Sequence, residues 1–171
     1  MRLFLALMPP PALRRRLGEL AERAHAHCGG RRVSDESLHL TLAFLGEIPD
    51  EQAEALSTWV EGLDVPGGEW HLDAWGAFRR PGIVWVGSQT PDRALVSLQA
   101  ALWHDLERQG ITGPPSRFIP HVTLLRGARR LETAGLTRPD LTWRYRQVAL
   151  LRSFTDPHGA RYTALARSPA P

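Results

Sequence analysis

The hydrophobic and polar positions of the chain follow two periods, one typical of strands and one typical of helices. Short apolar runs bounded by Gly, Pro or Asp predict strands, and apolar residues three or four positions apart predict amphipathic helices. The predicted strands cover residues 2–8, 37–45, 70–78, 83–87, 117–126, 144–153 and 160–167. The predicted helices cover residues 11–27, 50–63 and the stretch from Pro91 to the residue before Gly110.

Turn and cap residues separate these elements. Gly29-Gly30 ends the first predicted helix, and Asp50 is the expected N-cap of the second. Residues 79–82 contain Pro and Gly, as do residues 156–159, so each stretch predicts a turn between two strands. The sequence therefore predicts two strand pairs joined by short connections.

The remaining segments complete the predicted organisation. Residues 127–142 show neither period and are interpreted as a loop with room for one helical turn, and residues 168–171 as a frayed tail. No long Pro-, Gly- or Ser-rich linker divides the chain, so residues 1–171 are expected to form a single domain. The mixed order of strands and helices predicts an α+β fold with antiparallel sheet and helices packed on it.

The composition describes a folded, basic chain. Hydrophobic residues make up 43% of the sequence, which is ample for a core. The formal net charge is +3, and all 21 basic residues are arginine. Such a charge permits an anionic partner without requiring one, and the planar guanidinium suits phosphate. The run Arg14–Arg16, together with Arg23, is interpreted as a solvated helix face.

The cysteine count and the apolar runs bear on location. Cys28 is the one cysteine in the sequence, which excludes an internal disulfide and fits a reducing cytoplasm, the expected location. Residues 1–9 form too short an apolar run for a signal peptide, and no run approaches the roughly 20 residues of a membrane span. No membrane partner is therefore expected. His25 and His27, with Cys28, are interpreted as surface residues at a helix end.

One short pattern occurs twice and points to chemistry. His39-Leu-Thr41-Leu in the second predicted strand returns as His121-Val-Thr123-Leu in the strand at 117–126. Residues two apart in a strand lie on the same face, so each copy should present an imidazole beside a hydroxyl and turn the intervening apolar residue into a core. A lone strand histidine is usually a core residue, but a matched pair favours a catalytic function.

The paired side chains suit phosphodiester chemistry without a metal or a cofactor. A neutral imidazole can take a proton from an attacking hydroxyl or water, and an imidazolium can give one to the leaving oxygen. Thr41 and Thr123 can donate hydrogen bonds to non-bridging oxygens. Arg126 can hold a phosphate or stack on a base, and an exposed strand-end arginine is an equal alternative. Phe44 and Phe118 could stack on a base, although core packing is the expected role of Phe44.

Other common catalytic motifs are missing from the sequence. It contains no GxxxxGK[ST] or GxGxxG phosphate loop, no HExxH zinc motif and no GxSxG nucleophile elbow. Two alternatives to catalysis by His39 and His121 remain open at this point. One is a metallohydrolase that uses both as ligands, although a catalytic zinc usually has three protein ligands. The other is a binding module without catalytic activity.

The chain resembles a known family at these residues. The two His-x-Thr motifs are similar to the paired HxTx motifs of the 2H phosphoesterase superfamily. The wider pattern resembles its RNA 2′,3′-cyclic phosphodiesterase branch, also called 2′-5′ RNA ligase. The segments that carry this resemblance are Arg2-Leu-Phe-Leu-Ala, Leu38–Gly46, Pro120–Arg126, and Ser153 followed by Gly159 and Tyr162.

The resemblance implies a fold and a reaction. It implies a bilobal α+β fold of two antiparallel-rich sheets, with helices on the outside and a pseudo-twofold groove between the lobes. It implies hydrolysis of a 2′,3′-cyclic phosphate end of RNA, or of a nucleotide, to a 2′-phosphate. His39 would be the proton donor, His121 the proton acceptor, and Thr41 and Thr123 would hold the phosphate. The family is also described as joining RNA ends through 2′-5′ linkages. With this resemblance, the binding alternative becomes a module of the same fold that holds RNA ends without turning them over. A monomer is expected.

Overall fold

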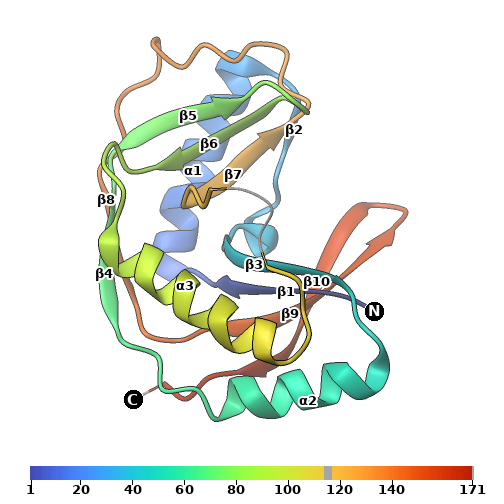
Figure 1. The fold of residues 1–171 in the computed structure, drawn as a ribbon. Helices are drawn as coiled ribbons and strands as arrows, with labels where there is room; N and C mark the ends of the chain where they lie inside the picture. The colour runs from blue at the N-terminus through green and yellow to red at the C-terminus, as the bar shows by residue number, and fades with distance from the viewer. Residues whose placement is uncertain (114–116, 171) are drawn as a thin grey trace.

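An eight-stranded antiparallel sheet organises the computed structural model, which describes residues 1–113 and 117–170 (Figure 1). Its strand order is β10-β9-β1-β3-β7-β6-β5, with β2 beside β7, and β4 and β8 form a separate two-stranded sheet. The strands are β1 Arg2–Leu7, β2 Arg31–Arg32, β3 Leu40–Glu47, β4 Gly68–Leu72, β5 Ala74–Phe78, β6 Ile83–Gly87, β7 His121–Arg126, β8 Leu141–Tyr145, β9 Ala149–Asp156 and β10 Gly159–Arg167. The helices are α1 Pro11–Cys28, α2 Asp50–Glu61 and α3 Arg93–Arg108, with a 3₁₀ turn at Asp35–Ser37.

The large sheet consists of two halves that diverge from a narrow junction. Strands β10, β9, β1 and β3 form one half, and β7, β6, β5 and β2 form the other (Figure 1). The halves join where β3 pairs with β7 through Leu40 opposite Val122. The structure thus has two antiparallel sheets, as expected, but the pairing of β3 with β7 makes the two halves one continuous sheet, and the second sheet is the small pair of β4 and β8.

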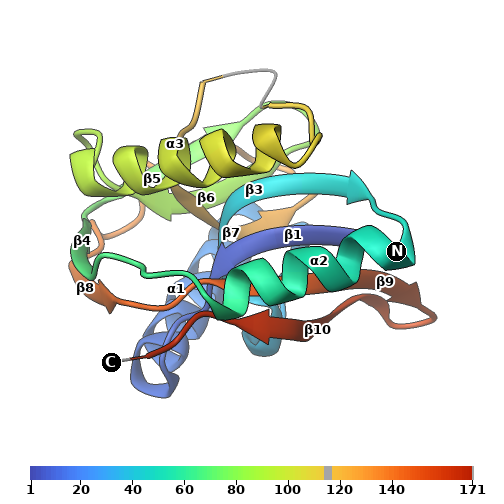
Figure 2. The same ribbon diagram turned by 60° about the horizontal axis from the view of Figure 1, so that its bottom comes forward.

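The helices pack on the sheet through one hydrophobic core. Helix α1 contacts β7, α2 contacts β9 and β10, and α3 contacts β3 and β4, as Figures 1 and 2 show from two sides. The central strand β1 alternates: Leu3, Leu5 and Leu7 enter the main core with the helices, whereas Phe4 and Ala6 face the other side. The α+β prediction is confirmed, and the helix-free face of the sheet remains open to a ligand.

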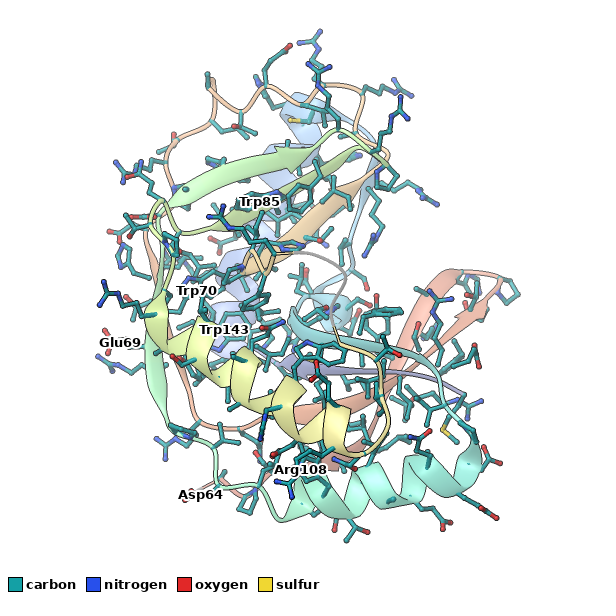
Figure 3. All side chains as sticks on the ribbon, in the orientation of Figure 1. Asp64, Glu69, Trp70, Trp85, Arg108 and Trp143 are labelled. Atoms are coloured by element: carbon teal, nitrogen blue, oxygen red, sulfur yellow. The ribbon has the colours of Figure 1, made fainter. Side chains whose placement is uncertain are left out.

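Two predicted strands are interrupted. Residues 70–78 divide at Asp73 into β4 and β5, and residues 144–153 divide after Tyr145 into β8 and β9. In each case the chain leaves the small sheet and enters the large one. Trp70 and Trp143, labelled in Figure 3, lie opposite each other in the small sheet with ring centroids 6.0 Å apart. A continuous apolar pattern does not reveal such a change of pairing partner.

Three local predictions at element ends are wrong. Pro49 is the N-cap of α2 and Asp50 is its first residue, without a side-chain cap bond. Cys28 is only 1% exposed, because the end of α1 packs against β6 and β7. Ser168, expected in a frayed tail, is 1% exposed and its hydroxyl accepts a hydrogen bond from the backbone N–H of Val148 at 2.8 Å. Within the described residues, no helix has the length and apolar character to cross a bilayer.

Candidate active site

A cavity of about 450 Å³ lies on the helix-free face, where the two halves of the sheet meet. The five residues proposed from the sequence for proton transfer and phosphate binding all line it, namely His39, Thr41, His121, Thr123 and Arg126. Two distant segments of the chain therefore contribute to one concave surface. Further residues that line the cavity include Arg2, Phe4, Ser37, Phe44, Ser153, Phe154, Thr155 and Tyr162.

The junction between β3 and β7 brings the two motifs together. Leu40 and Val122 are the residues between each histidine and its threonine, and they face each other across the antiparallel pair. Both are completely buried, as the two-residue period predicted. His121 is the first residue of β7, whereas His39 lies just before β3 rather than inside a strand beginning at residue 37. In an antiparallel pair, this register sets each histidine diagonally across from the other on one face.

The two imidazoles are held in the same way. Each Nδ1–H donates to the backbone carbonyl two residues earlier: His39 to Ser37 at 2.7 Å and His121 to Ile119 at 2.8 Å. A carbonyl only accepts, so these bonds place the proton of the neutral ring on Nδ1 and leave Nε2 as the basic nitrogen. Nε2 of His39 accepts from the Thr41 hydroxyl at 2.8 Å.

Aromatic side chains fix the ring of His39. Its centroid lies 5.0 Å from that of Phe4 and 5.2 Å from that of Tyr162, the latter at an interplanar angle of 86°. The rings of Phe4 and Tyr162 also meet edge to face at 5.1 Å. Such contacts hold an imidazole in one orientation while they remove it from water.

A second aromatic pair surrounds His121. Its centroid lies 5.1 Å from that of Phe78 at 89° and 5.8 Å from that of Trp85, which is labelled in Figure 3. The Trp85 ring lies over Gly76 of the neighbouring strand, where a Cβ would overlap it. This glycine therefore makes room for the ring that supports His121.

Burial and nearby cations keep both histidines neutral in the free protein. The pKa of His39 is lowered to about 4, mainly by burial and also by the charges of Arg126, His121 and Arg14, while the hydrogen bond to Ser37 opposes the shift. Burial, together with the charge of Arg126, also lowers the pKa of His121. Both imidazoles are therefore neutral at neutral pH in the free protein.

Matching bulges bring one further residue of each strand into the cavity. The register shifts by one residue after Leu42 in β3 and after Leu124 in β7, three positions beyond each histidine. Without the bulges, Phe44 and Arg126 would point toward the helices, because five positions separate each from its histidine. With them, both line the cavity.

Phe44 corrects one prediction from the sequence. It is 52% exposed, with the Arg2 guanidinium 5.1 Å from its ring centroid, so the expected role in the core is wrong. Phe118 is partly buried against the main core. Arg2 and Phe4 were not identified as site residues, although their two-residue spacing in a strand would have placed them on one face.

The part of the chain that the structure describes holds no group of metal ligands. There, no three or more His, Cys, Asp or Glu side chains are grouped so that they could hold a metal ion. His25, His27 and Cys28 at the end of α1 form no such group either, and of these three the cysteine is buried.

Comparison with known proteins identifies the family. Residues 7–85 match the family model described as LigT like Phosphoesterase. RNA 2′,3′-cyclic phosphodiesterase from Escherichia coli K12 is 34% identical over 168 residues, which cover 97% of this chain and 94% of that protein. The enzyme of the same name from Thermus thermophilus is 32% identical over 98% of this chain and 89% of its own length.

Solved structures agree with the sequence comparison. The crystal structure of E. coli LigT complexed with 3′-AMP has a TM-score of 0.84 and 33% identity, covering 97% of this chain and 95% of that one. TT0787 of T. thermophilus has a TM-score of 0.79 and 28% identity over 98% and 96% of the two chains. The chain therefore belongs to the LigT-like 2H phosphoesterases, in the RNA 2′,3′-cyclic phosphodiesterase family.

Proposed function

We propose that this protein hydrolyses 2′,3′-cyclic phosphate ends of RNA, or of nucleotides, to 2′-phosphates by acid–base catalysis that needs no metal. The observation that carries the proposal is the pair His39 and His121, two imidazoles with matching Nδ1–H bonds to backbone carbonyls in one cavity. The catalytic unit is the whole of residues 1–171, acting as one two-lobed domain and as a monomer, because each half supplies one histidine.

A local pseudo-twofold supports an in-line reaction. Leu40 and Val122 occupy equivalent positions in the two motifs and face each other, so an approximate twofold axis passes between them. A phosphorus atom on that axis has one imidazole on each side. In-line displacement requires this arrangement, since the attacking and leaving oxygens occupy opposite apical positions.

The proton transfers follow from this arrangement. Nε2 of His121 takes a proton from the attacking water, whose oxygen forms the new bond to phosphorus. The bond from phosphorus to the 3′ oxygen breaks, and the His39 imidazolium gives that oxygen its proton, leaving a 2′-phosphate. Once Nε2 of His39 is protonated it no longer accepts from the Thr41 hydroxyl, so Thr41 and Thr123 donate to the non-bridging oxygens, and Arg126 balances their negative charge. The histidines end with the proton on His121 rather than on His39.

The same steps allow RNA joining. If a 5′-hydroxyl of a second RNA replaces water, the same bond breaks and a 2′-5′ phosphodiester forms. Run backwards, this reaction cleaves a 2′-5′ linkage and regenerates the cyclic phosphate. The balance between hydrolysis and joining then depends on which nucleophile reaches His121.

The first experiment measures hydrolysis of a 2′,3′-cyclic phosphate end in the presence of a chelator. Full wild-type activity is expected, with losses on the order of 10² to 10⁴ in kcat for His39→Ala and for His121→Ala. His104→Ala, an exposed histidine on α3, is the matched control and should retain activity. Full activity in both site variants would contradict the mechanism, and saturable RNA binding without product by wild type would favour the RNA-end-binding alternative.

A second experiment separates the two histidines. A substrate whose 3′ leaving atom is sulfur needs no proton donor, because a thiolate leaves unprotonated. This substrate should restore most of the rate of His39→Ala and little of the rate of His121→Ala. The reverse pattern would exchange the two roles, and end-group analysis that finds a 3′-phosphate would contradict the bond cleavage proposed.

A further inference from the structure

Arg31 lies directly beside Arg126. Strand β2 runs antiparallel to the end of β7, with Arg31 opposite Arg126 and Arg32 opposite Leu125 (Figure 1). Residues directly opposite in such a pair lie on the same face of the sheet, and two like charges there destabilise it. Both arginine side chains are exposed. An anion bound between them would remove the repulsion.

The nearby carboxylates do not neutralise this pair. Arg32, the next residue, binds Glu22 at 2.8 Å and Asp35 at 2.6 Å. Among the ion pairs of residues 1–113 and 117–170, neither Arg31 nor Arg126 takes part. Two guanidinium groups therefore face the same surface without a carboxylate between them.

The two arginines line a groove that continues from the catalytic cavity. This groove has a volume of about 350 Å³ and contains Arg31 and Arg126. It shares Arg126, Ser37 and Tyr162 with the catalytic cavity. The Tyr162 ring, which contacts His39, therefore lies where the two spaces join. The shared lining residues place the groove next to the part of the cavity that contains His39.

Gly30 allows this close approach. Its φ is +84°, and a Cβ there would lie 2.8 Å from the carbonyl oxygen of Arg126. The end of α1 is also tied to the segment that follows β7, since the N–H groups of Arg129 and Arg130 donate hydrogen bonds to the carbonyl of Cys28. The position of Arg31 is thus fixed by backbone contacts and does not depend on its own side chain.

We propose that Arg31, together with Arg126, forms a second phosphate site, which binds the phosphate on the 5′ side of the terminal nucleotide. The inference rests on the proposed function, because it assumes that the cyclic phosphate lies between His39 and His121. One ribose separates adjacent phosphates of an RNA strand, and the groove adjoins the cavity through the shared Arg126. The bound phosphate can be an internal phosphodiester or a 5′-monophosphate, since both present the anionic oxygens that a guanidinium binds.

Three substrates test this site: a 2′,3′-cyclic mononucleotide with a free 5′-hydroxyl, the same compound with a 5′-phosphate, and a dinucleotide with a cyclic phosphate end. Wild type should show higher kcat/KM on the last two. Arg31→Gln should lower kcat/KM about tenfold on these two, and less than twofold on the first, because it removes one charged contact. Arg15→Gln, an exposed arginine of α1 outside this groove, is the matched control.

Salt provides a second measurement. For a longer RNA with a cyclic phosphate end, removal of one phosphate contact should reduce the slope of log binding constant against log salt by about 0.7. Arg31→Gln should show this decrease, Arg31→Lys should retain most of the wild-type slope, and Arg15→Gln should leave it unchanged.

The outcomes distinguish this inference from the proposed function. Equal losses in Arg31→Gln on all three substrates, or no loss on any of them, would overturn the second phosphate site while leaving the reaction in place. A loss only on the dinucleotide would overturn the phosphate assignment, because the second base or ribose would then be the group recognised. If wild type hydrolyses none of the three, the proposed function itself fails.

Discussion

The low pKa of His39 predicts that the protein takes up a proton from the solvent when an anion binds in the site. In the free protein this pKa is about 4, so at pH 7 about one His39 in a thousand is protonated. The proposed donor must be protonated when the reaction begins. The negative charge of the bound phosphate can raise the pKa of His39, whereas the charges of Arg126, His121 and Arg14 lower it.

The size of the effect follows from Coulomb's law. A unit negative charge about 4 Å from the imidazole stabilises the imidazolium by about 4 kcal/mol at an effective dielectric constant near 20. One pKa unit corresponds to about 1.4 kcal/mol, so the pKa should rise by about 3 units. The pKa of His39 would then move from about 4 in the free protein to about 7 in the complex, and about half of the complexes would be protonated at pH 7.

Sulfate is a suitable probe, since its charge does not change between pH 4.5 and pH 7.5. Because the complex binds a proton more tightly than the free protein, sulfate affinity should increase as pH falls from about 7 toward about 4, approaching tenfold per pH unit. Calorimetry in two buffers of different ionisation enthalpy should detect about half a proton taken up at pH 7. His39→Gln should lose most of this dependence, and His104→Gln should retain it.

Two results would refute this reasoning. One is sulfate binding by wild type that does not change with pH between 5 and 7. The other is an unchanged pH dependence in His39→Gln, which would assign the proton to another group. The pKa of His121 is also lowered, and His121→Gln therefore measures its separate share of the uptake.

Three further predictions concern stability. His39 takes up a proton near pH 6.5 in the unfolded protein but only near pH 4 in the native one, so the free energy of unfolding should decrease by up to about 3 kcal/mol as the pH is lowered from 6.5 to 4. Urea unfolding of His39→Gln should show a smaller decrease, and an equal decrease would contradict this. Gly76→Ala forces a Cβ against the Trp85 ring, so it should lower the free energy of unfolding by about 1–3 kcal/mol and also lower kcat. Unchanged urea unfolding and unchanged kinetics would refute the overlap. Ser168→Ala leaves the buried N–H of Val148 unpaired and should cost about 1–3 kcal/mol in thermal unfolding, and an unchanged melting temperature would exclude that role.

The sequence predicted most elements of the fold, because their patterns are local. Helix α1 and strand β1 have the predicted ends to within one residue, since a 3.6-residue period and a proline-bounded apolar run are recorded in the segment itself. The division of residues 70–78 was missed, because which strand β4 pairs with depends on β8, about seventy residues away. Pairing partners are a property of the tertiary fold, so no local period reports them.

The same distinction applies to the site. His39 and His121 could be found from the sequence because a repeated two-residue spacing fixes which side chains share a face. Phe44 was misassigned, because a bulge changes the face and leaves no mark on the apolar pattern. Arg31 gave no signal at all, because its importance comes from a cross-strand neighbour that follows it by 95 positions, from residue 31 to residue 126.

The two halves of the site differ in their charges although their motifs match. The charges of two arginines, Arg126 and Arg14, lower the pKa of His39, whereas Arg126 is the one arginine that lowers that of His121, so the electrostatics of the free protein do not favour His39 as the protonated member. If His39 is nevertheless the proton donor, the negative charge of the bound substrate must raise the pKa of His39 so that its imidazole becomes protonated. Two neutral imidazoles can lie close together in an empty cavity without repulsion, and the site becomes an acid–base pair only when a phosphate is bound. The catalytic proton would then be present on His39 in the enzyme–substrate complex and absent in the free enzyme. Proton uptake on anion binding is therefore the measurement that tests the mechanism most directly.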